Sequence, residues 1–309
     1  MSERPMIQRP TIQRLTAAAL LLSCLALPAL AADRNAAKKK FMEGYRLYKE
    51  KPAAAAKKIE EALKLDPTYD QARTFLGWLY NVQMGDAAKA LPHYDYLIER
   101  AEDRKVKAEA YSEKANIVYT TKKDAKAAVK LYNAAYKTYR LWRYADRASN
   151  LLLHEGLKDE ALTQAERAEV SINKLIDRLE TATEKETDAK RKAAGEARLA
   201  GEQKNRFKVR VHVATCLLAN GKGGEAESLL KELDLDKAPT RALYNVAMLY
   251  GEQGKTEKAA AALTGYLKTF GTAAGRNMLR EFIRTEPSFK AMKDSKAFKP
   301  LVTDEPEDA

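Results

Sequence analysis

Few residues of this chain have the types and spacing that catalysis or metal binding requires. His154-Glu155 begins the zinc pattern His-Glu-x-x-His, but Lys158 stands where the second histidine would be. The run Gly221–Gly224 (GKGG) is rich in glycine, yet it lacks the spacing of a phosphate-binding loop, Gly-x-x-x-x-Gly-Lys-Ser/Thr. The Gly-x-Ser-x-Gly nucleophile elbow is absent too. We therefore expect no catalysis, no metal site and no cofactor. The alternative is an enzyme whose site has an unrecognised form.

The N-terminal segment, 1–31, has the pattern of a Sec signal peptide. Arginines precede an uncharged apolar run over 15–27, and Ala29-Leu30-Ala31 ends the segment with small residues. We expect cleavage after Ala31 and a periplasmic or secreted protein. An uncleaved N-terminal anchor and a lipoprotein acylated at Cys24 are the alternatives. No later segment approaches the roughly 18 consecutive apolar residues of a membrane span, so none is expected after cleavage.

Cys216 would be the single thiol of the cleaved chain, because the sequence has 2 cysteines and Cys24 lies in the signal segment. A single thiol cannot form an internal disulfide. Its apolar neighbours, among them Val213 and Leu217, predict a small buried core residue rather than a nucleophile.

The composition predicts a helical protein. Of 309 residues, 45% are hydrophobic and 32% are charged, and the chain has 14 Gly and 10 Pro. These values exclude general disorder and a protein with several membrane spans, and the low Gly and Pro content favours helices. The net charge of +12 falls to +10 after cleavage, with the bases spread along the chain. An exported protein rarely meets nucleic acid, so we expect no nucleic-acid partner and consider phospholipid, cell-wall polymer or acidic protein instead.

Five segments repeat around a turn residue: Gly85, Lys123, Gly156, Gly221 and Gly254. Each copy has the same order, with a small residue 7 before the turn and a large residue 4 before it, then Ala 5 after it and a further apolar position 9 after it. The copy around Gly254 places Ala247, Tyr250, Ala259 and Leu263 there. Two copies depart at the small position, with Asn116 and Ser149, and the first half of the Gly85 copy is shifted by one residue.

The offsets have a physical explanation. Two antiparallel helices meet at a turn where glycine adopts φ > 0, small residues let the helix backbones approach, and larger residues fill the space to the next pair. The pattern resembles the tetratricopeptide repeat (TPR), including its closing Leu65-Asp66-Pro67 and a spacing of 33 residues between Gly221 and Gly254. This resemblance implies an all-α, TPR-like right-handed helical solenoid of about five to six helix pairs.

A charged insertion interrupts the repeats. The spacing doubles to 65 residues between Gly156 and Gly221, and 177–208 carries nine Lys/Arg against seven Asp/Glu. We expect an elongated helix or a helical hairpin that projects from the solenoid; a degenerate repeat is the structural alternative, and an arm that binds a partner is the functional one.

The chain ends in an element that would cover the last repeat. Leu279, Phe282 and Ile283 predict one apolar face, which Phe289, Met292, Phe298 and Leu301 continue. The expected segments are the signal peptide 1–31, N-terminal TPR-like repeats 32–170, the charged helical insertion 171–207, C-terminal TPR-like repeats 208–273, capping helices 274–302 and a disordered acidic tail 303–309.

The resemblance also implies where a partner would dock. In TPR arrays the first helix of each pair lines a concave groove, in which basic and amide side chains hold extended peptides. The groove-facing positions that carry such side chains here are Arg143, Arg147, Asn150, Lys208, His212, Arg241 and Asn245. The insertion separates the two halves of this set, and the alternative is that these side chains are ordinary polar surface.

The predicted function is a non-catalytic scaffold or adaptor of the bacterial cell envelope. It would hold one or more envelope proteins on its concave face, in an oligomeric state that the sequence leaves open. The alternative within the binding class is a basic accessory protein that binds the cell wall or another anionic surface.

Overall fold

The structure is helical throughout the residues that it describes, which are 33–234 and 238–303 of this computed structural model. No strand occurs in these ranges, so the expected all-α fold class is confirmed. The helices form two compact units that divide between Lys122 and Lys123, each with a hydrophobic core of its own. The expected signal peptide, and the expected acidic tail after residue 303, lie outside the described residues.

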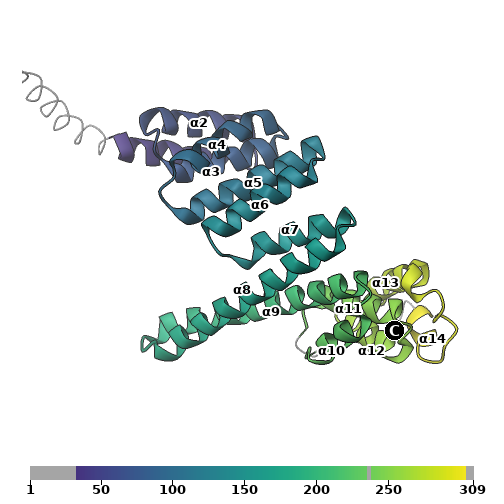
Figure 1. The fold of residues 1–309 in the computed structure, drawn as a ribbon. Helices are drawn as coiled ribbons and strands as arrows, with labels where there is room; N and C mark the ends of the chain where they lie inside the picture. The colour runs from purple at the N-terminus through teal and green to yellow at the C-terminus, as the bar shows by residue number, and fades with distance from the viewer. Residues whose placement is uncertain (1–32, 235–237, 304–309) are drawn as a thin grey trace, which may run out of the picture. The chain divides into compact units, whose positions relative to one another are not determined.

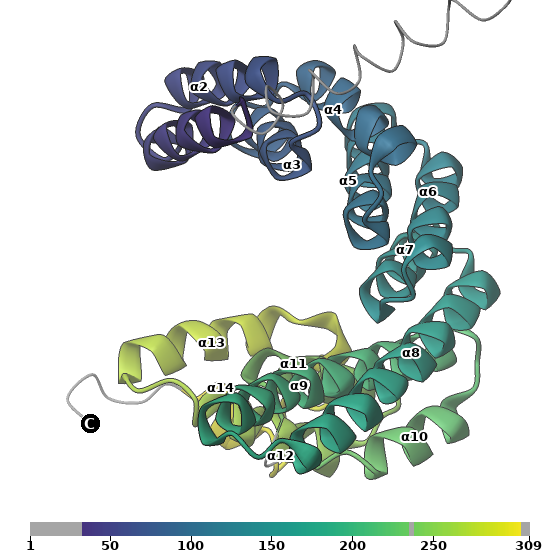
Figure 2. The ribbon, with the colours of Figure 1, turned by 90° about the vertical axis from the view of Figure 1, so that its left-hand side faces the viewer.

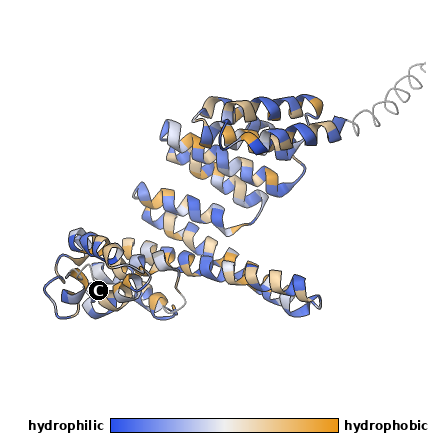
Figure 3. Cartoon of the chain, turned by 180° about the vertical axis from the view of Figure 1, so that it is seen from behind, coloured by the Kyte–Doolittle hydropathy of each residue, from blue (hydrophilic) through white to orange (hydrophobic). Residues whose placement is uncertain are grey.

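Unit 1 is a stack of helical hairpins. Its helices are residues 33–47, α2 (Pro52–Leu65), α3 (Asp70–Trp78), α4 (Ala87–Arg100) and α5 (Arg104–Lys122). Successive helices pack on each other, α2 on α3, α3 on α4 and α4 on α5 (Figures 1 and 2). Each helix mixes hydrophobic and hydrophilic residues along its length (Figure 3), which gives it one face for the core.

A π-helical turn, η2 (Leu79–Gln83), continues α3 and explains the shifted copy around Gly85. A π-turn places one extra residue in the helix, so the small position of this copy moves one residue toward the N-terminus. Gly77 occupies that position, and a Cβ there would lie 3.0 Å from Cζ of Tyr94. The missing side chain therefore lets the Tyr94 ring pack directly against α3.

The copy around Lys123 needs the same correction. Asn116, which the alignment places at the small position, is half-buried, whereas Ala115 is completely buried. The small position of this copy therefore lies 8 residues before Lys123, one residue earlier than the predicted offset. An amide with four hydrogen-bonding groups is unfavourable in a tight helix crossing, and Ala is not.

Unit 2 contains the remaining repeats. Its helices are α6 (Ala125–Thr138), α7 (Trp142–His154), α8 (Lys158–Lys185), α9 (Ala189–Ala219), α10 (Gly223–Lys231), α11 (Thr240–Glu252), α12 (Thr256–Leu267), α13 (Ala273–Thr285) and α14 (Lys299–Val302). α7 packs on α6 and α8, α9 packs on α8, α10 and α11, and α11 packs on α12.

The five predicted turn residues all adopt positive φ. The angles are 65° at Gly85, 75° at Gly156, 73° at Gly221, 70° at Gly254 and 54° at Lys123. The prediction of a left-handed turn at the centre of each repeat is confirmed. At the four glycines among them there is room for a side chain, since an added Cβ would meet no atom within 4 Å. Glycine is therefore favoured at these turns because of the positive φ and not because of crowding.

Hydrogen bonds close three of these turns in the Schellman pattern. The amide after each glycine donates to the carbonyl five residues before it, at 2.9 Å in all three cases: Leu157 to Leu152, Lys222 to Leu217, and Lys255 to Tyr250. The turn thereby satisfies helix-end carbonyls that would otherwise lack donors.

The charged insertion lengthens two helices that belong to consecutive repeats. α8 has 28 residues and α9 has 31, and residues 186–188 join them. The two helices run side by side as a hairpin (Figure 1). Gly195 makes the approach close, because a Cβ there would lie 2.7 Å from Thr183 Oγ1. The whole insertion lies within unit 2, which begins at Lys123.

Residues 268–303 pack on the last repeat helices of unit 2, with the short helix η4 (Pro287–Phe289) on α11 and α14 on α12 (Figures 1 and 2). Leu279 and Ile283 are buried on α13. The expectation for Phe282 was wrong, since 57% of its surface is exposed. Its side chain lies about 100° around the helix from Ile283 and so misses the core face.

We predict that Lys123→Gly stabilises unit 2 relative to Lys123→Ala by about 1 kcal/mol, because both variants lose the lysine side chain but only glycine accepts positive φ without steric cost. Urea unfolding of the two variants measures the difference. The matched change Gly156→Ala should destabilise the fold by a similar amount. Equal stabilities of the two Lys123 variants would show that the backbone at this turn is unstrained.

Candidate functional site

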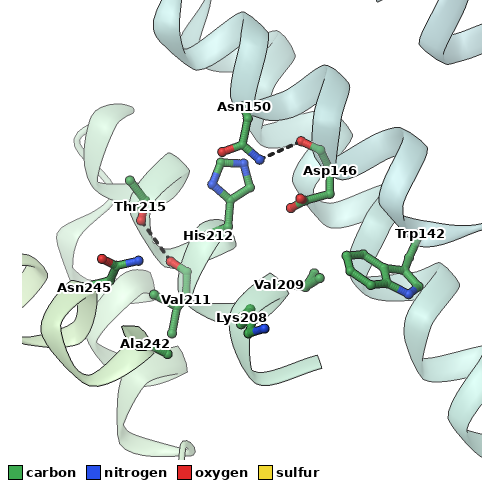
Figure 4. Close-up of a pocket in the computed structure, with 10 residues that line it drawn as sticks. All are labelled: Trp142, Asp146, Asn150, Lys208, Val209, Val211, His212, Thr215, Ala242 and Asn245. Carbon is green, nitrogen blue, oxygen red and sulfur yellow. Dashed lines mark hydrogen bonds between the residues drawn. The ribbon is translucent and has the colours of Figure 1, made fainter. Parts of the chain in front are cut away.

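A pocket of about 360 Å³ lies within unit 2 between α7, α9 and α11. Ten residues line it (Figure 4): Trp142, Asp146 and Asn150 from α7, Lys208, Val209, Val211, His212 and Thr215 from α9, and Ala242 and Asn245 from α11. The three residues of α7 are four apart, as are Lys208 and His212 on α9. This spacing brings side chains to one face of a helix.

Four of the residues predicted to bind a partner meet at this pocket: Asn150, Lys208, His212 and Asn245. The lining does not include Arg143 or Arg147, which lie on the same helix as Asn150. Arg241 belongs to α11, but its side chain lies outside the described residues.

Sequence reasoning missed the aromatic wall of the pocket. Trp142 was overlooked because it precedes the groove positions expected for its repeat. A signal was present, since Trp142 lies one helical turn before Asp146 and two turns before Asn150 and so shares their face.

A buried polar network lies beneath the pocket. Ser149 is fully buried, and its hydroxyl donates to the Ala161 carbonyl at 2.6 Å. His212 Nε2 lies 2.8 Å from the same hydroxyl oxygen. Because the single hydroxyl proton is directed to the carbonyl, Nε2 must be the donor to Ser149, which leaves Nδ1 as an acceptor. The network ties α7, α8 and α9 together where Ser149 replaces the usual small apolar residue.

Cys216 completes this network and is buried, as expected. Its sulfur lies 3.6 Å from Ser149 Oγ and 3.8 Å from His212 Nε2. Burial raises the pKa of the Cys216 thiol, which keeps it protonated and a poor nucleophile. The Ser149 hydroxyl is equally unsuited to attack a substrate, since it is inaccessible and its proton is bound by the backbone. The three side chains therefore serve packing rather than nucleophilic chemistry.

Two titratable side chains of the pocket have pKa values shifted in opposite directions. Burial raises the pKa of the Asp146 carboxyl to about 6, although the nearby Arg147 guanidinium acts against this shift. Burial lowers the pKa of the His212 imidazole to about 4. At neutral pH the pocket therefore holds an ionised carboxylate and a neutral imidazole.

A second pocket, of about 500 Å³, lies in unit 1 and differs in chemistry. Its walls include Phe41, Met42, Tyr45 and Phe75, and the ring centroids of Tyr45 and Phe75 are 5.2 Å apart. None of its lining residues is charged. Aromatic residues at helical spacing, Phe41 and Tyr45, were the sequence signal for this surface.

Metal and membrane sites are not evident in the part of the chain that the structure describes. No group of three or more His, Cys, Asp or Glu side chains is arranged to hold a metal ion there. His154, the histidine of the incomplete zinc pattern, is exposed and lies 3.3 Å from the Glu155 carboxylate. None of the described helices combines the length and apolar character needed to cross a bilayer.

We predict that the stability of Asp146→Asn relative to the wild type rises between about pH 4 and pH 6. The folded-state pKa of Asp146 is above its unfolded value, so ionisation of the carboxyl destabilises the wild type progressively over this range.

The pH dependence expected for His212 is the opposite. Its folded-state pKa is lowered, so protonation of the imidazole below about pH 6.5 destabilises the fold. His212→Asn should therefore lose stability relative to the wild type as pH rises from about 4 to about 6.5. Urea unfolding at several pH values tests both, and differences independent of pH would contradict the shifts.

Part of the chain matches a known family model. A tetratricopeptide-repeat family model matches residues 45–102 and 81–145. No curated protein sequence matches the chain. Among solved structures, pilF of Pseudomonas aeruginosa is 14% identical, with 86% of this chain and 100% of that chain covered and a TM-score of 0.51.

Two further structures are similar at lower TM-scores. YrrB, described as a TPR protein with an unusual peptide-binding site, is 18% identical, with coverages of 68% of this chain and 91% of that chain and a TM-score of 0.43. The TPR2AB domain of yeast Sti1, in a complex with pHSP90, is 14% identical, with coverages of 87% and 99% and a TM-score of 0.36.

These identities show similarity of fold. The family match, the five left-handed turns and the stacked helical hairpins agree with one another. Residues 45–145 thus match the tetratricopeptide-repeat family model, and the described helices up to 303 have the fold of a helical-repeat protein.

Proposed function

We propose that this protein is a non-catalytic adaptor that docks an extended segment of a protein partner in the unit 2 pocket. The observation that carries the proposal is the pair of exposed amides, Asn150 on α7 and Asn245 on α11, which line the same pocket on either side of His212 (Figure 4). An extended peptide has backbone N–H and C=O groups without partners, and an amide side chain both donates and accepts. Two such side chains from different helices suit a backbone that crosses between them.

The other lining residues suit the side chains of such a segment. Trp142, Val209, Val211 and Ala242 provide apolar contact area, and Lys208 adds a positive charge. A pocket of mostly apolar walls with a few polar groups that fix orientation is the usual form of a binding site. The orientation of Asn150 is itself restrained, because its Nδ2 donates to the Asp146 carbonyl at 2.8 Å.

The proposed cellular location rests on the sequence. The basic, apolar and small-residue pattern of 1–31 supports export, with cleavage after Ala31 and a partner in the bacterial envelope.

We predict that the double variant Asn150→Ala/Asn245→Ala lowers affinity for a docked peptide by about tenfold or more, since each lost hydrogen bond to the backbone contributes about 0.5–1.5 kcal/mol. Peptides selected from a displayed random library on the wild-type chain, followed by calorimetric titration, provide the measurement.

Asn35→Ala is the matched control, because Asn35 is an exposed amide in unit 1. Selected peptides that bind the double variant and the control equally would overturn the assignment of the groove. Binding that depends on Phe75 instead would move the site to the pocket in unit 1.

The second candidate function is binding to an anionic surface of the envelope, and the charge of α9 favours it. From Ala189 to Lys208 this helix carries two acidic residues and seven basic ones, all seven exposed: Lys190, Arg191, Lys192, Arg198, Lys204, Arg206 and Lys208. The insertion has nearly balanced charge as a whole, but its basic residues are concentrated on α9 and its acidic residues lie mainly before α9. Such a helix attracts polyanions through long-range electrostatics.

We predict that Lys190→Glu/Arg191→Glu/Lys192→Glu abolishes any retention of the protein on cell-wall sacculi or on vesicles with anionic lipid at low salt. Retention of the wild type should fall steeply as salt rises, because salt screens exposed charges. The control is the same reversal at Lys38, Lys39 and Lys57, which are exposed in unit 1. Equal loss from both triple variants would indicate attraction by net charge rather than by the hairpin.

A further inference from the structure

Asp146 is the unusual residue of the unit 2 pocket. Its carboxylate faces the pocket on the same side of α7 as the Trp142 ring (Figure 4). Among the described residues no hydrogen-bond donor reaches this carboxylate; the bond at Asp146 is made by its backbone carbonyl. A desolvated carboxylate without a donor is costly for a folded protein, so its position calls for an explanation.

The charges around Asp146 leave it able to attract a cation. Arg147, the next residue on α7, acts on the carboxylate through charge and without a hydrogen bond. His212 remains neutral because burial lowers its pKa to about 4, so it does not repel a cation at neutral pH. Lys208 lines the pocket, but it lies on exposed surface and is not among the charges that shift Asp146.

Trp142 is held in place beside this carboxylate. Its indole Nε1 donates a hydrogen bond to Glu202 Oε2 at 3.3 Å. Asn205 Nδ2 donates to the same oxygen at 3.1 Å. This contact across α7 and α9 fixes the ring and adds a second carboxylate at its edge. An aromatic face next to a carboxylate is a favourable site for an ammonium or guanidinium group, through cation–π attraction and an ion pair.

We infer that the Trp142 and Asp146 side chains form a subsite for a basic side chain of the docked peptide, with arginine preferred over lysine. The inference rests on the proposed docking function. A planar guanidinium stacks on the indole while its N–H groups donate to Asp146 and to an acceptor such as His212 Nδ1. A lysine ammonium makes the ion pair but lacks the planar stacking. The subsite therefore gives the groove a preference for a positively charged peptide side chain, whereas Lys208 alone would suggest a preference for a negatively charged one.

The test uses the tryptophan of the subsite as its reporter. The chain has 2 tryptophans, Trp78 in unit 1 and Trp142, so Trp78→Phe leaves Trp142 as the single emitter. The probes are the capped peptide Ala-Ala-Arg-Ala-Ala and the same peptide with citrulline, which keeps the shape of arginine but has no charge. We expect Trp142 emission to change saturably as peptide is added. The affinity for the arginine peptide should be at least about tenfold higher than for the citrulline peptide, because the uncharged peptide loses a charge-assisted contact.

Asp146→Asn, made in the Trp78→Phe background, should remove the preference for arginine while leaving the weaker binding of the citrulline peptide. Asp177→Asn is the matched control, because it removes an exposed carboxylate of α8 that does not line the pocket; the preference for arginine should persist. Circular dichroism confirms that each variant keeps its helices.

Equal affinity for the two peptides, or no saturable binding of either up to millimolar concentration, overturns the inference. The proposed docking function fails separately, when library-selected peptides bind the Asn150→Ala/Asn245→Ala variant as well as the wild type. Selected peptides that lack basic residues and still depend on these two amides would leave docking intact and refute the basic subsite.

Discussion

The architecture depends on one constraint, which is that a single amphipathic helical hairpin cannot bury its apolar face without a neighbour. Close helix approach therefore has to recur at every repeat, and fully buried alanines such as Ala214, Ala226, Ala247 and Ala259 make it possible. The left-handed turn sets the angle at which each second helix returns. The turn requires a residue with positive φ and does not require close packing at that residue. The turn glycines accordingly have open space where a Cβ would be.

One repeat replaces the close-packed small residue with a polar one and compensates for the change. Ser149 cannot be buried without hydrogen bonds, and it obtains them from the Ala161 carbonyl and from His212. The resulting network joins three helices at the base of the long hairpin. The network also fixes the imidazole tautomer. Because the buried Ser149 hydroxyl must accept a hydrogen bond from His212 Nε2, the other ring nitrogen, Nδ1, is left as an acceptor.

The pocket above this network combines groups that burial affects in opposite ways. Desolvation favours the neutral form of both Asp146 and His212, and at neutral pH only the imidazole achieves it. An ionised carboxylate beside an indole ring then lies in a wall otherwise rich in amides and apolar groups. The polarity of this pocket thus differs from that of the aromatic pocket in unit 1, although the same repeat builds both units.

The repeat could be predicted from the amino-acid sequence, because small residues, aromatic residues and turn glycines recur at spacings that reflect local helix geometry. The sequence located all five left-handed turns, including the one at Lys123. It placed Asn150 and His212 among groove residues from their offsets, and both line the pocket. It did not reveal the one-residue shift at Asn116, since the crossing that buries Ala115 depends on packing.

Which side chains from different repeats contact one another depends on the packing of the helices and could not be predicted from the sequence. The juxtaposition of Ser149 with His212 spans 63 residues, and that of Trp142 with Glu202 spans 60. The position of Phe282 was decided in the same way, by which side of α13 packs. Offsets within a repeat follow from the helix period, whereas burial, charge and hydrogen bonding between repeats depend on how the long hairpin brings α7 and α9 together.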